Sequence, residues 1–210
     1  NEKKTTGKSR LIFLAHPGNY GKYIMELVPG QIVAEKYSIE AQVGEGANGV
    51  VYRARDIILG KKIALKFLRS EYIRNLSQRR RFLKEARIAV QFVHKGVVPV
   101  REVNDWHDSL YIVMDYHPGK TLKELIASRP LSFSEVALLS EQLLHCLQEA
   151  HQKNLLHRDI KPSNLMVQEQ DGKCESMQIL DFGLAISQND FQEKLPTGTL
   201  HYMSPEQVFG

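Results

Sequence analysis

A run of polar residues in the second half of the chain combines an acid, a cation and potential metal ligands in a fixed order. It reads His-Arg-Asp-Ile-Lys-Pro-Ser-Asn over residues 157–164, and Asp181 opens an Asp-Phe-Gly triplet further on. Asp159 can accept a proton, and Lys161 can neutralise developing negative charge. Asn164 and Asp181 offer oxygen ligands of the kind that Mg²⁺ prefers. Phosphoryl transfer from a nucleotide to a hydroxyl needs these parts, because its catalysis rests on positioning and charge neutralisation.

A glycine-rich segment precedes this run in the first half of the chain. Residues 43–51 contain the pattern Gly-x-Gly-x-x-Gly-x-Val. Glycine lets backbone amides approach phosphate oxygens closely, since no Cβ intervenes. A dinucleotide-binding fold uses the same spacing, but it requires a helix directly after the loop and an acid about 20 residues on. Here β-branched and aromatic residues continue as a strand and Lys66 follows, which disfavours that alternative.

Lys66 ends an Ile-Ala-Leu-Lys pattern whose inward positions include Ala64 and Lys66 itself. A buried lysine without a partner costs free energy. Glu85, in a predicted helix, is the obvious counter-charge, and the pair would hold the ammonium group near the nucleotide phosphates. The alternative is a lysine that faces solvent from an edge strand. His157 fits a packing and hydrogen-bonding role better than that of a base.

The elements that must position these residues fall into two sets. Period-two alternation predicts strands over 37–43, 50–55, 62–67, 97–103 and 110–114. A helix that begins near Ser77 interrupts them. After a sharp break at residues 117–119 the pattern turns helical, over 122–127 and 134–151. Two short strands, 165–167 and 178–180, would then fold Asp181 back towards Asn164.

The composition bounds the class of protein. With 210 residues, 42% of them hydrophobic, the chain can form one large domain or two small lobes. The net charge of +4 is mild and the basic clusters lack interleaved aromatics, which disfavours nucleic-acid binding. Cys146 and Cys174 show no metal-ligand spacing. No apolar run approaches the roughly 18 residues of a membrane span, so we expect a cytoplasmic location, with an anchor outside this stretch left open.

Together the motifs resemble those of eukaryotic-type (Hanks-type) serine/threonine protein kinases, and the resemblance covers residues 37–210. The residues within the motifs are similar to those of bacterial members of the family. Ser-Pro-Glu at 204–206 corresponds to the family's Ala-Pro-Glu. The resemblance implies an α+β, bilobal fold. An antiparallel β-rich N-lobe with one helix would span 37–116, and a mainly helical, incomplete C-lobe would span 117–210. Residues 1–36 would form a leader of unknown role.

The resemblance also implies site residues. The catalytic set would be Asp159, Lys161, Lys66 and Glu85. The metal ligands would be Asn164 and Asp181. The ATP-binding set would be Val43, Gly44, Glu45, Gly46, Ala47, Asn48, Gly49, Val51, Ala64, Lys66, Met114, Asp115, His117 and Met166. Met114 would be the gatekeeper, and the backbone of Asp115 and His117 would hydrogen-bond the adenine edge. Candidate activating phosphorylation sites are Ser187 and Thr197.

The implied cofactors are ATP and Mg²⁺, and the implied partners are proteins that bear serine or threonine. Self-association for phosphorylation in trans fits the two candidate phosphosites. Two other functions stay open: a nucleotide-binding scaffold that regulates a partner, and a small-molecule kinase. The intact motif residues count against the first, and the Ser-Pro-Glu segment, which seats a peptide in the family, against the second. The family's C-lobe continues past this segment, so we expect residues 1–210 alone to be poorly stable and weakly active.

Overall fold

The computed structural model describes residues 26–209, apart from 47–48, 69–79, 81–82, 84–85, 87–89, 108, 181–185 and 188–199. The chain divides into two compact units. The first lies within residues 1–81 and 101–116, and the second within residues 82–100 and 117–210. Within the described residues, no helix is both long and apolar enough to cross a membrane.

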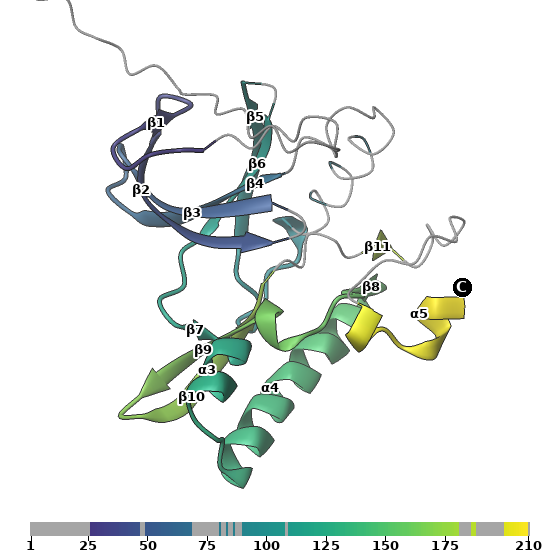
Figure 1. The fold of residues 1–210 in the computed structure, drawn as a ribbon. Coiled ribbons are helices and arrows are strands. Elements are labelled where there is room, and N and C mark those ends of the chain that lie inside the picture. Colours follow the sequence, from purple (N-terminus) through teal and green to yellow (C-terminus); the bar gives the residue numbers. More distant parts are fainter. Residues whose placement is uncertain are drawn as a thin grey trace, which may run out of the picture. The chain divides into compact units, whose positions relative to one another are not determined.

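The first unit is built on a six-stranded sheet with the order β1-β2-β3-β4-β6-β5 (Figure 1). Its strands are β1 (Ile32–Val33), β2 (Tyr37–Gly46), β3 (Gly49–Asp56), β4 (Lys62–Leu68), β5 (Val100–Trp106) and β6 (Ser109–Asp115). From β1 through β4 to β6, neighbouring strands pair antiparallel. The antiparallel sheet predicted for the first half of the chain is therefore confirmed.

One face of this sheet carries the core of the first unit. Alternate residues of the strands meet there, as the pleat requires: Tyr37, Ile39, Val50, Tyr52, Ala54, Ile63, Leu65, Phe67, Tyr111 and Val113. Leu27 and Val33 belong to the same core, and the Leu27 amide donates to Tyr52 Oη at 3.3 Å. With β1, the sheet therefore begins before Tyr37, the first residue of the stretch that carries the family resemblance.

Strand β5 begins later than its sequence pattern predicts. The predicted start at residue 97 is wrong, because Val97 and Val98 pair elsewhere. The Val98 amide donates to the Ile179 carbonyl at 3.0 Å, and the Ile179 amide donates to the Gly96 carbonyl at 2.8 Å. These contacts tie the segment to the second unit, and Pro99, which has no N–H, separates it from Val100.

The helix predicted in the first half is present where it is described. Residues 80, 83, 86, 90 and 91 are helical. Ala86 and Phe92 are buried and Val93 is exposed. Glu85, the expected partner of Lys66, lies outside the described residues.

The second unit combines helices with short strands (Figure 1). Besides the helical residues between 83 and 91, its described α-helices are α3 (Leu122–Ser128), α4 (Phe133–Gln152) and α5 (Pro205–Phe209). Its described strands are β7 (Lys120–Thr121), β8 (Leu155–Leu156), β9 (Leu165–Gln170), β10 (Lys173–Ile179) and β11 (Ile186–Ser187). Capping boxes begin α3 at Thr121 and α4 at Ser132, each with a glutamate three residues on. Both predicted helices are confirmed.

Helix α4 packs on the hairpin that β9 and β10 form. Its buried stripe consists of Leu139, Cys146 and Ala150, whereas Val136 is exposed. The stripe shares a core with residues of the hairpin: Leu165, Val167, Cys174, Met177 and Ile179. The hairpin strands are longer than predicted and turn at Asp171 and Gly172, both of which have positive φ.

Candidate active site

Four strand residues predicted to hold the nucleotide share one face of the first sheet. Val51 lies opposite Lys66 in the register of β3 and β4, and Ala64 lies opposite Met114 in the register of β4 and β6. Directly paired residues point to the same side of a sheet. Their neighbours along the strands, such as Leu65, fill the hydrophobic core on the opposite face. The sheet therefore sets these four side chains apart from the core.

Lys66 is only 7% exposed. Its strand β4 has β3 on one side and β6 on the other. This position excludes the alternative of a solvent-facing lysine on an edge strand. An ammonium group at a buried position in the sheet is costly unless charged or polar groups compensate it.

The three glycines of the glycine-rich segment differ in what surrounds them. A Cβ on Gly49 would lie 2.0 Å from the Phe67 carbonyl oxygen, so the strand pairing itself requires glycine there. A Cβ on Gly44 would make only ordinary contact with Val51, and one on Gly46 would meet nothing within 4 Å. Strand β2 extends to Gly46, beyond the predicted end at residue 43.

The second unit brings three predicted residues together in one loop. Lys161 Nζ lies 2.6 Å from Asp159 Oδ2, and Asn164 Nδ2 lies 3.0 Å from the same oxygen. Asn164 Nδ2 also donates to the Asp159 carbonyl at 2.8 Å. The carboxylate therefore accepts from a cation and from an amide at once.

Asn164 is suited to hold a metal ion. Because its amide nitrogen is committed to Asp159, its Oδ1 is the atom that it can offer, and a hard cation such as Mg²⁺ prefers such an oxygen. The Leu180 amide donates to the Asn164 carbonyl at 2.8 Å. The hairpin therefore brings the residue before Asp181 to Asn164, as the spacing of the two motifs predicts. Asp181 itself lies outside the described residues.

His157 is buried and connects two backbone groups by hydrogen bonds. The Asp159 amide donates to His157 Nδ1 at 3.2 Å, so the ring proton of a neutral His157 lies on Nε2. His157 Nε2 then donates to the Leu180 carbonyl at 3.1 Å. These contacts match the hydrogen-bonding role that the sequence suggests.

A long-range contact reaches this loop from α5. Gln207 Nε2 donates to the Arg158 carbonyl at 2.8 Å. No sequence pattern predicts it, because the two residues lie 49 positions apart and a surface glutamine is ordinary in a short helix. Its only signal in the sequence is its place directly after Ser-Pro-Glu.

The two residues predicted to meet the adenine edge, Asp115 and His117, belong to different units. Asp115, at the end of β6, forms an ion pair with Arg101 of β5. His117 begins the second unit, and its Nδ1 is buried without a hydrogen-bond partner among the described residues. Burial lowers the pKa of the His117 imidazole. Met166, on β9, is partly buried.

Some predicted site residues are not described or are described only by their backbone. Ala47, Asn48 and Thr197 lie outside the described residues. Val43 and Glu45 are exposed near the end of β2. Ser187 belongs to β11, where its backbone lies opposite Leu155 of β8.

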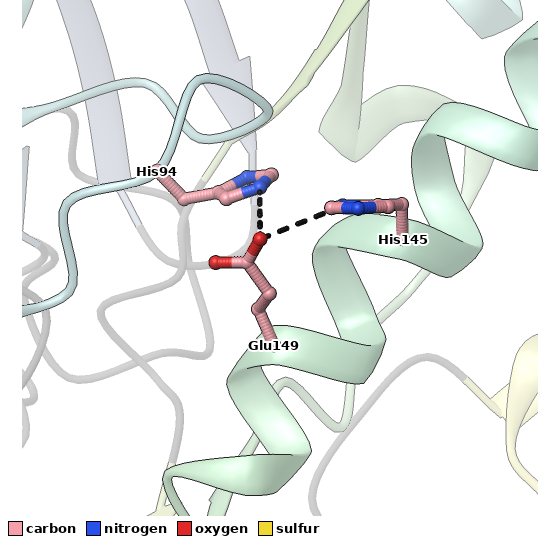
Figure 2. Close-up of side chains that lie close together, drawn as sticks. All are labelled: His94, His145 and Glu149. Atoms are coloured by element: carbon pink, nitrogen blue, oxygen red, sulfur yellow. Dashed lines mark ion pairs between the residues drawn. The ribbon is translucent and has the colours of Figure 1, made fainter.

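A second group of titratable side chains lies at α4 (Figure 2). Glu149 Oε1 lies 3.5 Å from His94 Nε2 and 3.6 Å from His145 Nδ1. His94 Nδ1 already accepts a hydrogen bond from the Gly96 amide at 2.9 Å, so its ring proton lies on Nε2 and faces the carboxylate. A metal at Nε2 would have to displace that proton, whereas metal-bound histidine normally donates from its other nitrogen. The arrangement therefore favours a hydrogen-bonded His–Glu pair over a metal site.

Comparison with known proteins places this geometry in a family. The chain is 35% identical over 185 residues to the serine/threonine-protein kinase PrkC of Bacillus subtilis (strain 168), which covers 86% of this chain and 28% of that protein. It is 35% identical over 191 residues to the serine/threonine-protein kinase pkn3 of Myxococcus xanthus, which covers 86% of this chain and 35% of that protein. The chain thus spans about a third of the length of these relatives.

A solved structure gives the same result. The crystal structure of a double mutant of the Mycobacterium tuberculosis PknI kinase domain matches with a TM-score of 0.68 and 30% sequence identity, over 77% of this chain and 64% of that chain. The expected α+β, bilobal kinase fold is therefore confirmed. Residues 37–210 match the protein kinase domain family. From the motifs, the fold and these matches together, we conclude that the chain belongs to the protein kinase domain family.

Proposed function

We propose that this chain is the catalytic domain of a serine/threonine protein kinase, which transfers the γ-phosphoryl group of ATP to hydroxyl groups of proteins. The observation that carries the proposal is the hydrogen-bonded group of Asp159, Lys161 and Asn164. It supplies a proton acceptor, a cation and a metal ligand within one loop, which are the parts that phosphoryl transfer requires.

In this proposal Asp159 accepts the proton of the attacking hydroxyl. Asn164 holds its carboxylate from one side while Lys161 donates to the same oxygen. Lys161 also brings positive charge to the place where negative charge builds up on the transferred group. Asn164 and Asp181 would hold Mg²⁺, which when bound neutralises and orients the phosphate oxygens.

The nucleotide-binding roles follow the sheet register. We assign the contact with the phosphates to Lys66, with Glu85 as its partner, and to the backbone of residues 43–49. We assign the contact with adenine to the side chains of Val51, Ala64, Met114 and Met166 and to the backbone of Asp115 and His117. Supporting this, Lys66 is buried on the same sheet face as Val51, Ala64 and Met114.

The relatives favour a hydroxyl substrate of the serine/threonine class, since PrkC and pkn3 are both named serine/threonine kinases. We further propose that protein substrates are the partners and that the chain phosphorylates itself in trans, with Ser187 and Thr197 as acceptors. We also propose that the kinase acts in signalling.

Phosphate transfer from labelled ATP with Mg²⁺ tests the proposal on the full-length protein that contains this domain. A generic basic protein serves as acceptor, and the labelled amino acids are separated afterwards. We expect label on serine or threonine, and Asp159→Asn is expected to slow transfer by roughly 10²-fold while nucleotide affinity stays nearly intact, because the base is lost but no ATP contact is. Asp171→Asn, an exposed acid in the β9–β10 turn, is the matched control.

The results separate the candidate functions. Label that vanishes in Asp159→Asn and persists in Asp171→Asn supports the kinase. Nucleotide binding without any label would indicate a regulatory scaffold instead. A large loss of nucleotide affinity in Asp159→Asn would contradict the role of Asp159 as base, because it would show that the residue supports the structure of the site.

A further inference from the structure

The peptide bond between Arg158 and Asp159 is held at both of its polar ends. Its N–H, from Asp159, donates to His157 Nδ1 at 3.2 Å. Its C=O, from Arg158, accepts from Gln207 Nε2 at 2.8 Å. A peptide plane fixed at both ends cannot rotate without breaking a hydrogen bond, and its orientation sets the direction in which the Asp159 side chain leaves the backbone.

The backbone at this point needs such support. Arg158 has φ of +62°, in the left-handed region that residues with a side chain seldom adopt. Such a conformation persists where the surrounding contacts impose it, and it is often found at functional sites. The Asp159 carbonyl and carboxylate are held on the other side by Asn164 Nδ2. Gln207 thus supports the strained residue directly before Asp159.

The Gln207 side chain is itself held in the orientation that this contact requires. Its Oε1 accepts from the Ser204 amide at 3.2 Å and from Ser204 Oγ at 3.4 Å. The amide nitrogen, the only donor of the group, therefore faces Arg158. The backbone N–H of Gln207 in turn donates to the Ser204 carbonyl at 3.0 Å. The side chain is fixed by the same turn that begins α5.

We propose that Gln207 is a positioning residue for phosphoryl transfer, which acts by fixing the Arg158–Asp159 peptide and so the direction of the Asp159 carboxylate. The proposal rests on the proposed kinase function. It assigns a positioning role to the turn that Ser-Pro-Glu and Gln207 form: only when residues 204–207 form this turn does the catalytic loop receive its donor. Gln207 touches neither the hydroxyl nor the nucleotide in this role.

Removing the donor tests this role. Gln207→Glu keeps the oxygen that accepts from Ser204, but it places a carboxylate against the Arg158 carbonyl. In the full-length protein we expect turnover per nucleotide-binding site to fall by about 10-fold or more, because small displacements of a catalytic group cost that much. KM for ATP is expected to stay within about twofold, because the ATP-binding residues are not touched. Gln207→Met, which has neither donor nor charge, is expected to show the same split and decides the matter if Gln207→Glu does not fold.

A matched control separates positioning from stability. Gln142 on α4 bridges in the same manner: its Nε2 donates to the Glu175 carbonyl at 3.1 Å and its Oε1 accepts from the Met177 amide at 2.8 Å. We expect Gln142→Glu to lower the melting temperature as much as Gln207→Glu does, yet to leave turnover unchanged. Equal losses of turnover in both variants would overturn the proposal.

The Asp159→Asn background gives the decisive comparison. If Gln207 acts through Asp159, Gln207→Glu should change the residual turnover of Asp159→Asn by less than about twofold, because residues that act as a unit are not additive. The same loss in both backgrounds, or wild-type turnover in Gln207→Glu, would overturn the positioning role. Failure of the kinase function itself is a different result, since wild type and Asp159→Asn would then transfer equally little label.

Discussion

At the scale of single residues, the proposed chemistry depends on backbone groups as much as on side chains. Asp159 has its amide, its carbonyl and its carboxylate in separate hydrogen bonds. The left-handed conformation of Arg158 is a cost that this network offsets. The backbone also decides the role of the glycines of β2 and β3, which differ in what an added side chain would meet. Gly49 is required by a close backbone approach within the sheet, and Gly46 is not.

Two alanine substitutions distinguish these reasons. Gly49→Ala should lower the free energy of unfolding by about 1–3 kcal/mol, because its Cβ would meet the Phe67 carbonyl oxygen at 2.0 Å. Gly46→Ala should change it by less than about 0.5 kcal/mol, since the added methyl meets open space. If Gly46 serves the phosphates, this second variant loses nucleotide affinity instead. Urea denaturation and nucleotide titration measure the two effects, and equal loss of stability in both variants would contradict this assignment.

At the scale of elements, the start of α4 joins three parts of the second unit. Glu135 completes the capping box at Ser132 and accepts from the Cys174 amide of β10 at 3.1 Å. It also pairs with Arg129, at the end of α3, at 2.6 Å, and Arg129 pairs with Glu169 of β9 at 2.9 Å. The Arg129 guanidinium, together with the backbone amides of Ser132 and Cys174, holds the pKa of Glu135 well below its usual value.

This depressed pKa predicts a dependence of stability on pH. A carboxyl group with a lower pKa in the folded state stabilises the fold above its ordinary pKa of 4.5, and this stabilisation is lost as the pH falls from there towards the folded pKa. We therefore expect Glu135→Gln to be less stable than wild type at pH 7, and the difference between the two to shrink as the pH is lowered to about 3.

Thermal unfolding at both pH values measures the effect. Glu141→Gln, an exposed position on the same helix, is the control and should leave the pH dependence of wild type unchanged. A difference between wild type and Glu135→Gln that is as large at low pH as at neutral pH would contradict the role of the Glu135 charge.

At the scale of the whole molecule, the described residues form two separate hydrophobic cores. Leu65 lies in the core of the first unit and Leu125 in that of the second, both with 0% exposure. The only tryptophan, Trp106, packs against the first core and lies 6.3 Å from Phe67 between ring centroids. Helix α4, with 20 residues, belongs to the second unit. Tryptophan fluorescence and far-ultraviolet circular dichroism therefore report mainly on different units.

Substitution in each core tests whether the units unfold separately. Leu65→Ala and Leu125→Ala should each lower the free energy of unfolding by about 2–5 kcal/mol, because each leaves a cavity in a closed core. We expect Leu65→Ala to shift mainly the fluorescence transition in urea, and Leu125→Ala mainly the dichroism transition. If both probes shift together in both variants, the two cores form one cooperative unit and the expectation of separate unfolding is wrong.

Much of the fold follows from local patterns in the sequence. Strands β2, β3 and β4 and helices α3 and α4 appear where alternation and helical spacing predict them, with ends that differ by a few residues. The start of β5 could not be predicted in this way, because the same valines pair with Ile179 across a long stretch of chain. Likewise, a β-branched run says that a strand forms but not which strands flank it, so the burial of Lys66 became clear only from the sheet order.

The sequence by itself determined which reactive groups the chain contains, their order, and the family that this order indicates. Residue type and spacing express these properties directly, and the two short strands predicted between Asn164 and Asp181 already imply that Asp181 returns towards Asn164. The tertiary structure alone decided that Gln207 donates to the Arg158 carbonyl directly before Asp159, and that His94 meets Glu149 as a hydrogen-bonded pair. These contacts join residues far apart in the chain, and their geometry depends on how the elements pack, which no local pattern specifies.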